Sequence, residues 1–93
     1  MSSRPDPATN AYRKDLADTA LVGRVIASHY AEPLIRHLIA NADLRAGPSD
    51  DSALIAALGK GNAIRILDNS RGWAWGYAPD GRVGYIQAAA VGA

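Results

Sequence analysis

Apolar and polar side chains alternate with a period of two near the end of the chain, in residues 72–86. In the first arm three aromatic rings alternate with three small residues, in the order Trp73, Ala74, Trp75, Gly76, Tyr77 and Ala78. On a β-strand this alternation puts the rings on one face and the small groups on the other. The sequence Pro79-Asp80-Gly81 supplies a turn, because Pro presets one dihedral and Asp-Gly tolerates positive φ. A second arm follows with Val83, Tyr85 and Gln87 on one face, so pairing of the two bulky sets would make an aromatic platform.

Several further segments have strand composition and are separated by turn residues. They are 25–30, 34–39, 52–58 and 63–67, of which 63–67 has the most strand-like composition. The segment 34–40 also fits a helix, but Pro33 and Asn41 bound it closely and favour a strand. Gly76 and Gly84 lie inside predicted strands, where glycine is costly unless the backbone must bend or be approached closely. Short strands with such kinks predict a small, mostly β barrel.

The chain divides into a lead, an extension and the barrel. Residues 1–10 are polar and contain two prolines, which predicts a disordered lead. Residues 11–41 form an extension packed on the barrel, with a short helix that Asn10 caps and that runs to about Ala20. The helix is predicted because Tyr12, Leu16 and Ala20 are spaced by four. Residues 42–93 form the barrel, which 88–91 could close with one helical turn.

Composition and charge exclude several classes of function. The 93 residues suffice for one small domain, and the net charge of +1 gives no electrostatic footprint for nucleic acid or an anionic membrane. The chain has no cysteine, no apolar run of membrane-spanning length and no signal-peptide pattern at its start. We therefore expect a monomeric, cytoplasmic domain without disulfides, and no membrane or nucleic-acid partner.

The aromatic residues are the main candidates for a binding site. A barrel of this size already has enough aliphatic residues to fill it, and forcing in four more rings would cost roughly 1–3 kcal/mol each. We therefore expect at least two of Trp73, Trp75, Tyr77 and Tyr85 at the surface, where an aromatic patch usually contacts a partner. Three coverings are open: a ligand, a neighbouring domain or the 11–40 segment. Asp80, Arg82 and Arg45 could supply polar groups beside the rings.

The remaining motifs indicate no metal site, no cofactor site and no catalytic site. His29 and His37 lie on separate predicted strands with no third ligand nearby, so we expect no metal site. Gly59-Lys60-Gly61 lacks the flanking residues of a phosphate loop, and we expect no cofactor. No catalytic set stands out, and we expect no catalytic residues and no enzyme activity in this chain.

Residues 42–91 contain motifs that resemble those of bacterial SH3-like domains. Ala42-Asp43-Leu44-Arg45-Ala46-Gly47-Pro48-Ser49 is similar to their opening signature. Four further motifs follow in that family's order and spacing. They are Leu58-Gly59-Lys60-Gly61, Ile64-x-Ile66-Leu67, Gly72-Trp73 and Gly81-x-x-Gly84-Tyr85-Ile86. The resemblance implies an SH3-like barrel.

A narrower resemblance includes the N-terminal extension. The motifs concerned are Asp15-Leu16-Ala17, Leu21-x-Gly23-x-Val25 and Tyr30, followed by Gly72-Trp73-Ala74-Trp75-Gly76. Together they resemble the N-terminal region of NlpC-type cysteine peptidases of the dipeptidyl-peptidase group, which trim cell-wall peptides. In those enzymes an SH3-like domain precedes the papain-like catalytic domain, and no such catalytic domain is present in these residues. The resemblance implies a non-catalytic module that shapes the substrate groove or binds muropeptide, with a cell-wall peptide or an NlpC-type catalytic domain as its partner.

The resemblance also bears on the site residues. Such enzymes often have a tyrosine after Asp-Gly that helps to hold the amino end of the substrate, whereas this chain has Arg82, which favours a carboxylate. We expect ligand contacts from five residues: Trp73, Trp75, Asp80, Arg82 and Tyr85. The alternative function is a stand-alone SH3-like domain that binds a protein or an extended peptide.

Overall fold

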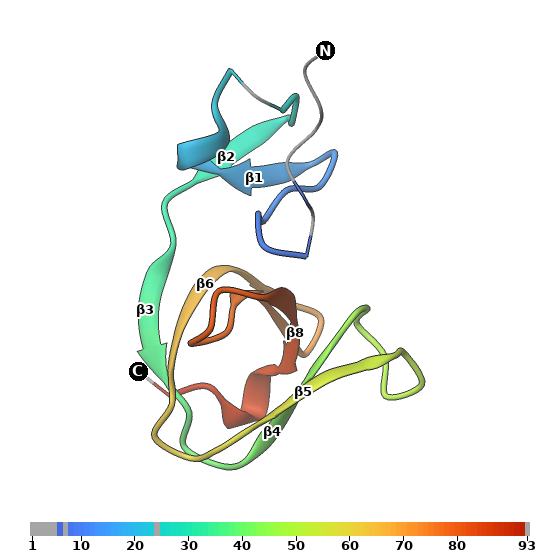
Figure 1. The fold of residues 1–93 in the computed structure, drawn as a ribbon, viewed down its shortest axis with the longest axis vertical. Coiled ribbons are helices and arrows are strands. Elements are labelled where there is room, and N and C mark those ends of the chain that lie inside the picture. The colour runs from blue at the N-terminus through green and yellow to red at the C-terminus, as the bar shows by residue number, and fades with distance from the viewer. Residues whose placement is uncertain (1–5, 7, 24, 93) are drawn as a thin grey trace.

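The computed structural model describes residue 6 and residues 8–23 and 25–92. In it the chain forms two parts that follow one another along the long axis (Figure 1). The N-terminal part pairs β1 (Leu16–Asp18) with β2 (His29–Ala31) in parallel, and the 3-10 turn η1 (Thr19–Leu21) follows β1. The second part is a six-stranded antiparallel sheet in the order β3-β6-β7-β8-β4-β5. Its elements are β3 (Leu34–His37), β4 (Ala42–Arg45), β5 (Leu54–Leu58), β6 (Ala63–Ser70), β7 (Trp73–Tyr77), β8 (Val83–Gln87) and the closing 3-10 turn η2 (Ala88–Ala90).

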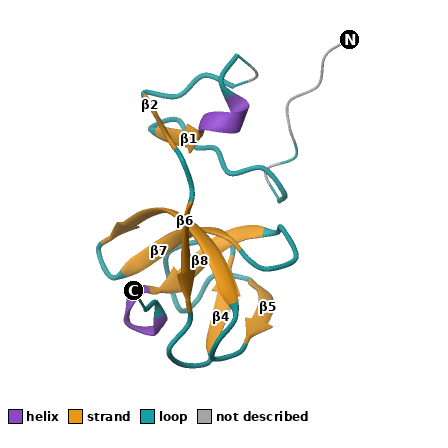
Figure 2. Ribbon diagram, turned by 90° about the vertical axis from the view of Figure 1, so that its left-hand side faces the viewer, coloured by secondary structure: helices purple, strands orange, loops and turns teal. Residues whose placement is uncertain are grey.

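The six-stranded sheet curls back on itself (Figure 2) and encloses an apolar core. The edge strands β3 and β5 are not paired with each other, so the barrel is partly open. The small side chains of the hairpin face inward, with Ala74, Ala78 and Ile86 buried in the core. They pack with Leu38, Leu44, Ile64, Ile66 and Ala90. The structure thus confirms the predicted small, mostly β SH3-like fold.

Two glycines let the strands approach closely at the bends of the sheet. Gly76 and Gly84 are partners in the β7–β8 register. A Cβ on Gly76 would overlap the carbonyl oxygen of Arg65 and lie 2.9 Å from the Cα of Ile66. A Cβ on Gly84 would lie 2.7 Å from the carbonyl oxygen of Arg45. Glycine is therefore required at both positions, as the sequence predicts for a kinked barrel.

The residues of the two turns that flank β7 explain the backbone conformation of those turns. Arg71 and Gly72 have φ of 55° and 82°, so they form the two-residue connection with positive φ that matches the twist of the strands. β6 extends to Ser70, beyond the strand predicted at 63–67. At the other end of β7, Gly81 has φ of 90°, and its N–H donates to the carbonyl of Ala78 at 2.9 Å. This is the turn predicted from Pro79-Asp80-Gly81.

The predicted helix ending near Ala20 is wrong. Residues 11–18 instead form a tight hairpin, in which the N–H of Arg13 donates to the carbonyl of Leu16 at 2.7 Å and Tyr12 bridges Ala17. Ala17 is fully buried. Two or three turns of isolated helix are marginal in water, so these tertiary contacts override the spacing that suggested a helix.

Other boundaries also differ from the prediction. The strand expected at 25–30 is β2, which starts only at His29. β3, which the sequence placed in the extension, is a strand of the barrel sheet and pairs with β6. Of the predicted disordered lead, residues 1–5 and 7 lie outside the described residues, while Thr9 and Asn10 donate backbone bonds to the carbonyl of Asp6.

Among the described residues, no helix has the length and apolar character needed to cross a membrane.

Candidate functional site

The aromatic hairpin has the pairing that its alternation predicts. Trp73 lies opposite Gln87, Trp75 opposite Tyr85 and Tyr77 opposite Val83. These side chains therefore share the face of β7 and β8 that points away from the barrel core. The rings lie outside the barrel, as the argument from overfilling predicts.

These rings are nevertheless not an open platform, which corrects the expectation of exposed rings. Trp75 is only 3% exposed and Tyr77 is buried, while Trp73 and Tyr85 are half-buried. Trp75, Tyr77 and Val83 form a second apolar cluster with Ala11. Leu16, Leu67 and Tyr85 pack against it. The sequence left open whether a ligand, a neighbouring domain or the 11–40 segment covers the rings. In the structure the N-terminal segment covers this cluster.

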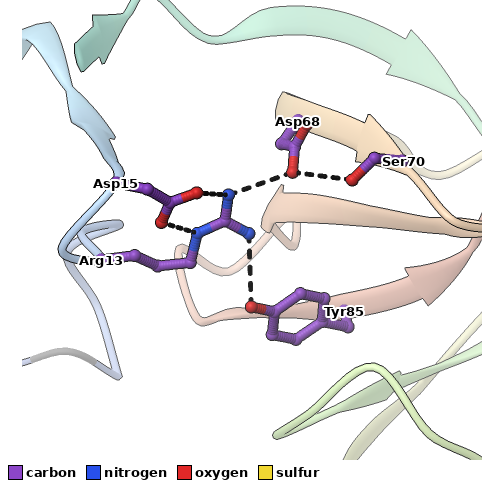
Figure 3. Close-up of polar contacts among 5 residues, drawn as sticks. All are labelled: Arg13, Asp15, Asp68, Ser70 and Tyr85. Atoms are coloured by element: carbon purple, nitrogen blue, oxygen red, sulfur yellow. Dashed lines mark hydrogen bonds and ion pairs between the residues drawn. The ribbon is translucent and has the colours of Figure 1, made fainter. Parts of the chain in front are cut away.

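Arg13 is the polar centre of this contact (Figure 3). Its guanidinium binds Asp15 through two bonds of 3.0 Å and Asp68 through one of 3.0 Å, and it donates to the Tyr85 hydroxyl at 3.3 Å. The guanidinium carbon lies 4.3 Å from the centre of the Trp75 ring, within cation–π range. Trp75 and Tyr85, both predicted to bind a ligand, thus bind a cation of their own chain.

A second polar contact lies beside the first. The Tyr77 hydroxyl donates to a carboxylate oxygen of the buried Asp18 at 2.7 Å and accepts the N–H of Ala11 at 2.9 Å. The N–H of Val83 donates to the carbonyl of Ala8 at 2.7 Å. Together with Arg13, these bonds fix the N-terminal segment on the hairpin.

The contacts shift the pKa values of several groups. Although partial burial disfavours its charge, bonds to Tyr85, Asp68 and Asp15 raise the pKa of Arg13. The bond from Arg13 lowers the pKa of Asp15. Burial, followed by the bond to Asp18, raises the pKa of Tyr77. Arg13 is therefore cationic, and Tyr77 a neutral hydroxyl, at any physiological pH.

Trp73 lines a different feature, an open groove of about 490 Å³ between β7, β8 and the β4–β5 hairpin. Its apolar lining residues are Trp73, Ala42, Ala57 and Leu58. Its other lining residues are Asn41, Asp43, Arg45, Asp50, Gly59 and Gln87. We call this feature the Trp73 groove. Its volume lies within the range of small-molecule sites.

The charges in the Trp73 groove have both signs and are already paired. Arg45 donates to a carboxylate oxygen of Asp43 at 3.3 Å and to the carbonyl of Ser52 at 2.9 Å. The Gln87 amide donates to Asp50 at 2.8 Å. A ligand that replaces these contacts would find a carboxylate for an ammonium group and a guanidinium for a carboxylate, next to the Trp73 ring.

Asp80 and Arg82 belong neither to the lining of the Trp73 groove nor to the partners of Arg13. The turn that holds them closes the Tyr77–Val83 end of the hairpin, whereas Trp73 pairs with Gln87 at the opposite end. The two side chains form an ion pair of 2.6 Å, and Arg82 also donates to the carbonyl of Ile55 at 3.1 Å. The backbone N–H of Arg82, followed by its guanidinium, lowers the pKa of Asp80. The five predicted ligand residues therefore occupy three places rather than one site.

The sequence reasoning missed most of the groove and the Arg13 contact. Gln87 lies on the same alternating face as Trp73, which is the signal that could have placed it in the groove. No local signal links Arg13 to Asp68 and Tyr85, because they are 55 and 72 residues away in the chain. His29 lies in β2 and His37 in β3, which belong to different sheets. In the described ranges, no three His, Cys, Asp or Glu side chains gather where a metal ion could bind.

Comparison with known proteins identifies the barrel. The family model of the bacterial dipeptidyl-peptidase SH3 domain matches residues 44–91, just over half of the chain. The comparisons with curated proteins and with solved structures find no match. The match runs from Leu44, within β4, through η2 and includes Trp73, Trp75 and both strand glycines. The chain therefore belongs to the bacterial dipeptidyl-peptidase SH3 domain family.

Proposed function

We propose that this domain is a non-catalytic module of a cell-wall cysteine peptidase and binds muropeptide in the Trp73 groove. Membership of a peptidase-associated SH3 family supports the link to a peptidase. The chain has no cysteine, so the nucleophile of such an enzyme belongs to another domain. In this arrangement the SH3-like module forms one wall of the substrate groove.

The observation that carries the proposal is the mixed chemistry of the Trp73 groove. A muropeptide stem such as L-Ala-γ-D-Glu-diaminopimelate carries ammonium and carboxylate groups along a short, partly apolar chain. Asp43 and Asp50 match the ammonium groups, and Arg45 matches a carboxylate. The indole of Trp73 supplies apolar contact area. The groove thus offers a partner to both ammonium groups, to one of the three carboxylates and to the apolar part of this ligand.

Replacing the indole of Trp73 tests the proposal. We expect Trp73→Ala to weaken binding of L-Ala-γ-D-Glu-diaminopimelate by about tenfold, the effect of losing one central aromatic contact. Isothermal titration calorimetry on the wild type and the variant measures this. A melting curve of the variant checks that the fold is kept, since Trp73 is only half-buried.

Leu34→Ala is the matched control. Leu34 is a large apolar side chain that is 56% exposed on β3, outside the Trp73 groove. We expect this variant to bind the tripeptide like the wild type. The proposal fails if the wild type releases no binding heat at millimolar tripeptide, or if folded Trp73→Ala binds as tightly as the wild type.

The alternative function, binding of an extended peptide, is supported by a different observation. β3 is an edge strand of the barrel, and Leu34 and Ile35 are both exposed on it. Such an edge can accept a further strand from a partner. In this case Leu34→Ala, and not Trp73→Ala, would weaken binding of the partner.

A further inference from the structure

The guanidinium of Arg13 occupies a pocket that belongs to the barrel. The barrel contributes the carboxylate of Asp68 and the hydroxyl of Tyr85 (Figure 3). It also contributes the indole face of Trp75, which lies beneath the guanidinium. Ser70 donates to the same oxygen of Asp68 that Arg13 binds, at 3.2 Å, and so holds this carboxylate in place. We call Asp68, Trp75 and Tyr85 the guanidinium pocket.

The register of the sheet builds this pocket without help from the N-terminal segment. Asp68 on β6 pairs with Trp75 on β7, and Trp75 pairs with Tyr85 on β8. The three side chains therefore form one row across three adjacent strands. An irregularity between Ile66 and Asp68 shifts β6 by one residue and brings Asp68 into this row. A pocket on consecutive strands of one sheet is preorganised.

The chemistry of the pocket fits a guanidinium better than other cations. The guanidinium carbon lies over the Trp75 ring while its N–H groups donate to Asp68 and Tyr85. Stacking and directional donation together are properties of arginine, whereas a lysine ammonium is a hydrated point charge without a flat face. The pocket therefore recognises arginine by shape as well as by charge.

The residue that fills the pocket lies on a segment that is separable from the barrel. Within the described residues, 8–31 contribute no strand to the six-stranded sheet and have their own parallel pair, β1 and β2. The Arg13 side chain is 23% exposed and that of Asp15 is 69% exposed, so solvent reaches the mouth of the pocket. The segment can therefore leave the pocket without breaking the sheet.

We infer that the guanidinium pocket is an arginine-recognition site, and that an arginine-bearing peptide segment of a partner protein competes with Arg13 for it. Exchange replaces one guanidinium with another at the same three barrel groups. It also uncovers the cluster around Trp75 and Tyr77, to which the arriving segment adds its own apolar contacts. This inference goes beyond the proposed function. The muropeptide stem contains no arginine, and it is proposed to bind in the Trp73 groove rather than in the guanidinium pocket.

The experiment vacates the pocket in the full chain and offers a small probe. The Arg13→Ala protein is titrated with N-acetyl-arginine amide, with N-acetyl-citrulline amide as the neutral probe of nearly equal shape. We expect saturable NMR shifts of the Trp75 indole with the arginine probe and at least about tenfold weaker binding of the citrulline probe. The double variant Arg13→Ala/Asp68→Asn should lose the preference for arginine, and the Trp73 indole should not move.

A folded Arg13→Ala protein without a saturable shift at Trp75, or with equal affinity for both probes, overturns the inference. If Arg13→Ala does not fold, the wild type is tested by hydrogen exchange at Ala11 and Val83, whose N–H groups bond across the contact. Millimolar N-acetyl-arginine amide should accelerate exchange at both amides, and citrulline should not. Unchanged exchange overturns the inference, whereas tripeptide binding at Trp73 is measured separately and can fail independently.

Discussion

Gly76→Ala is expected to destabilise the domain by at least about 3 kcal/mol, near the upper limit for overpacking a well-packed site. The added methyl group would overlap the carbonyl oxygen of Arg65 and lie 2.9 Å from the Cα of Ile66. Both are backbone atoms of the neighbouring strand β6, so no side chain can change rotamer to make room. β6 must move away from β7, and the barrel core beneath it loses its packing.

Thermal unfolding followed by circular dichroism measures this effect. A loss of about 3 kcal/mol lowers the melting temperature of a domain of this size by roughly 10–25 °C. Gly59→Ala is the matched control, because the nearest heavy atom to its added Cβ is at 3.8 Å. We expect the control to melt within a few degrees of the wild type. Similar melting temperatures for both variants would show that β6 and β7 are not in close contact at Gly76.

Trp75→Ala is expected to cost about 3–5 kcal/mol of stability, the usual effect of removing a buried indole. Trp75 is 3% exposed and packs with Ala11, Tyr77 and Val83. The change also removes the ring on which Arg13 stacks, a contact that contributes roughly 0.5–2 kcal/mol more. The loss should therefore loosen the N-terminal segment together with the hairpin.

Trp73→Ala is the natural comparison, because the same residue type lies two positions away on the same strand face. Trp73 is half-buried and faces an open groove, so its removal leaves a smaller cavity. Urea unfolding monitored by circular dichroism gives the free energy of unfolding of each variant. The burial of Trp75 beneath the N-terminal segment would be contradicted by a Trp75→Ala protein as stable as Trp73→Ala.

The hairpin could be predicted from sequence because its signals are local. Alternation, an Asp-Gly turn and two strand glycines are each contained within about fifteen residues, and each depends on backbone sterics rather than on distant partners. The register that places Trp75 opposite Tyr85 follows from them. The family motifs of residues 42–91 likewise predicted the barrel, and the match to residues 44–91 confirms it.

The N-terminal segment could not be predicted in the same way, because its structure depends on distant partners. Tyr12 and Leu16 have helical spacing, yet the backbone there turns back and is held by contacts with the hairpin. The buried Asp18 is satisfied by Tyr77, which lies 59 residues away in the chain. Local propensity is a weak prior for so short a segment, and tertiary contacts decide its structure.

The same limitation explains why the predicted ligand site divides into three places. Sequence alternation shows which side chains share a strand face, but not what packs against that face. Trp73, Trp75 and Tyr85 do share a face. The N-terminal segment covers only the part of it around Trp75, and the Trp73 end remains open. The division of the hairpin into a covered and an open half is thus a tertiary property.

A two-dimensional NMR titration with L-Ala-γ-D-Glu-diaminopimelate, observed at the two tryptophan indole N–H signals, tests muropeptide binding most directly. Trp73 lines the open groove, whereas Trp75 is buried beneath Arg13. We predict saturable shifts of the Trp73 indole and of the Gln87 side-chain amide, with the Trp75 indole unchanged. An unchanged Trp73 signal up to millimolar tripeptide, or a saturable shift of Trp75 alone, would contradict the proposed groove.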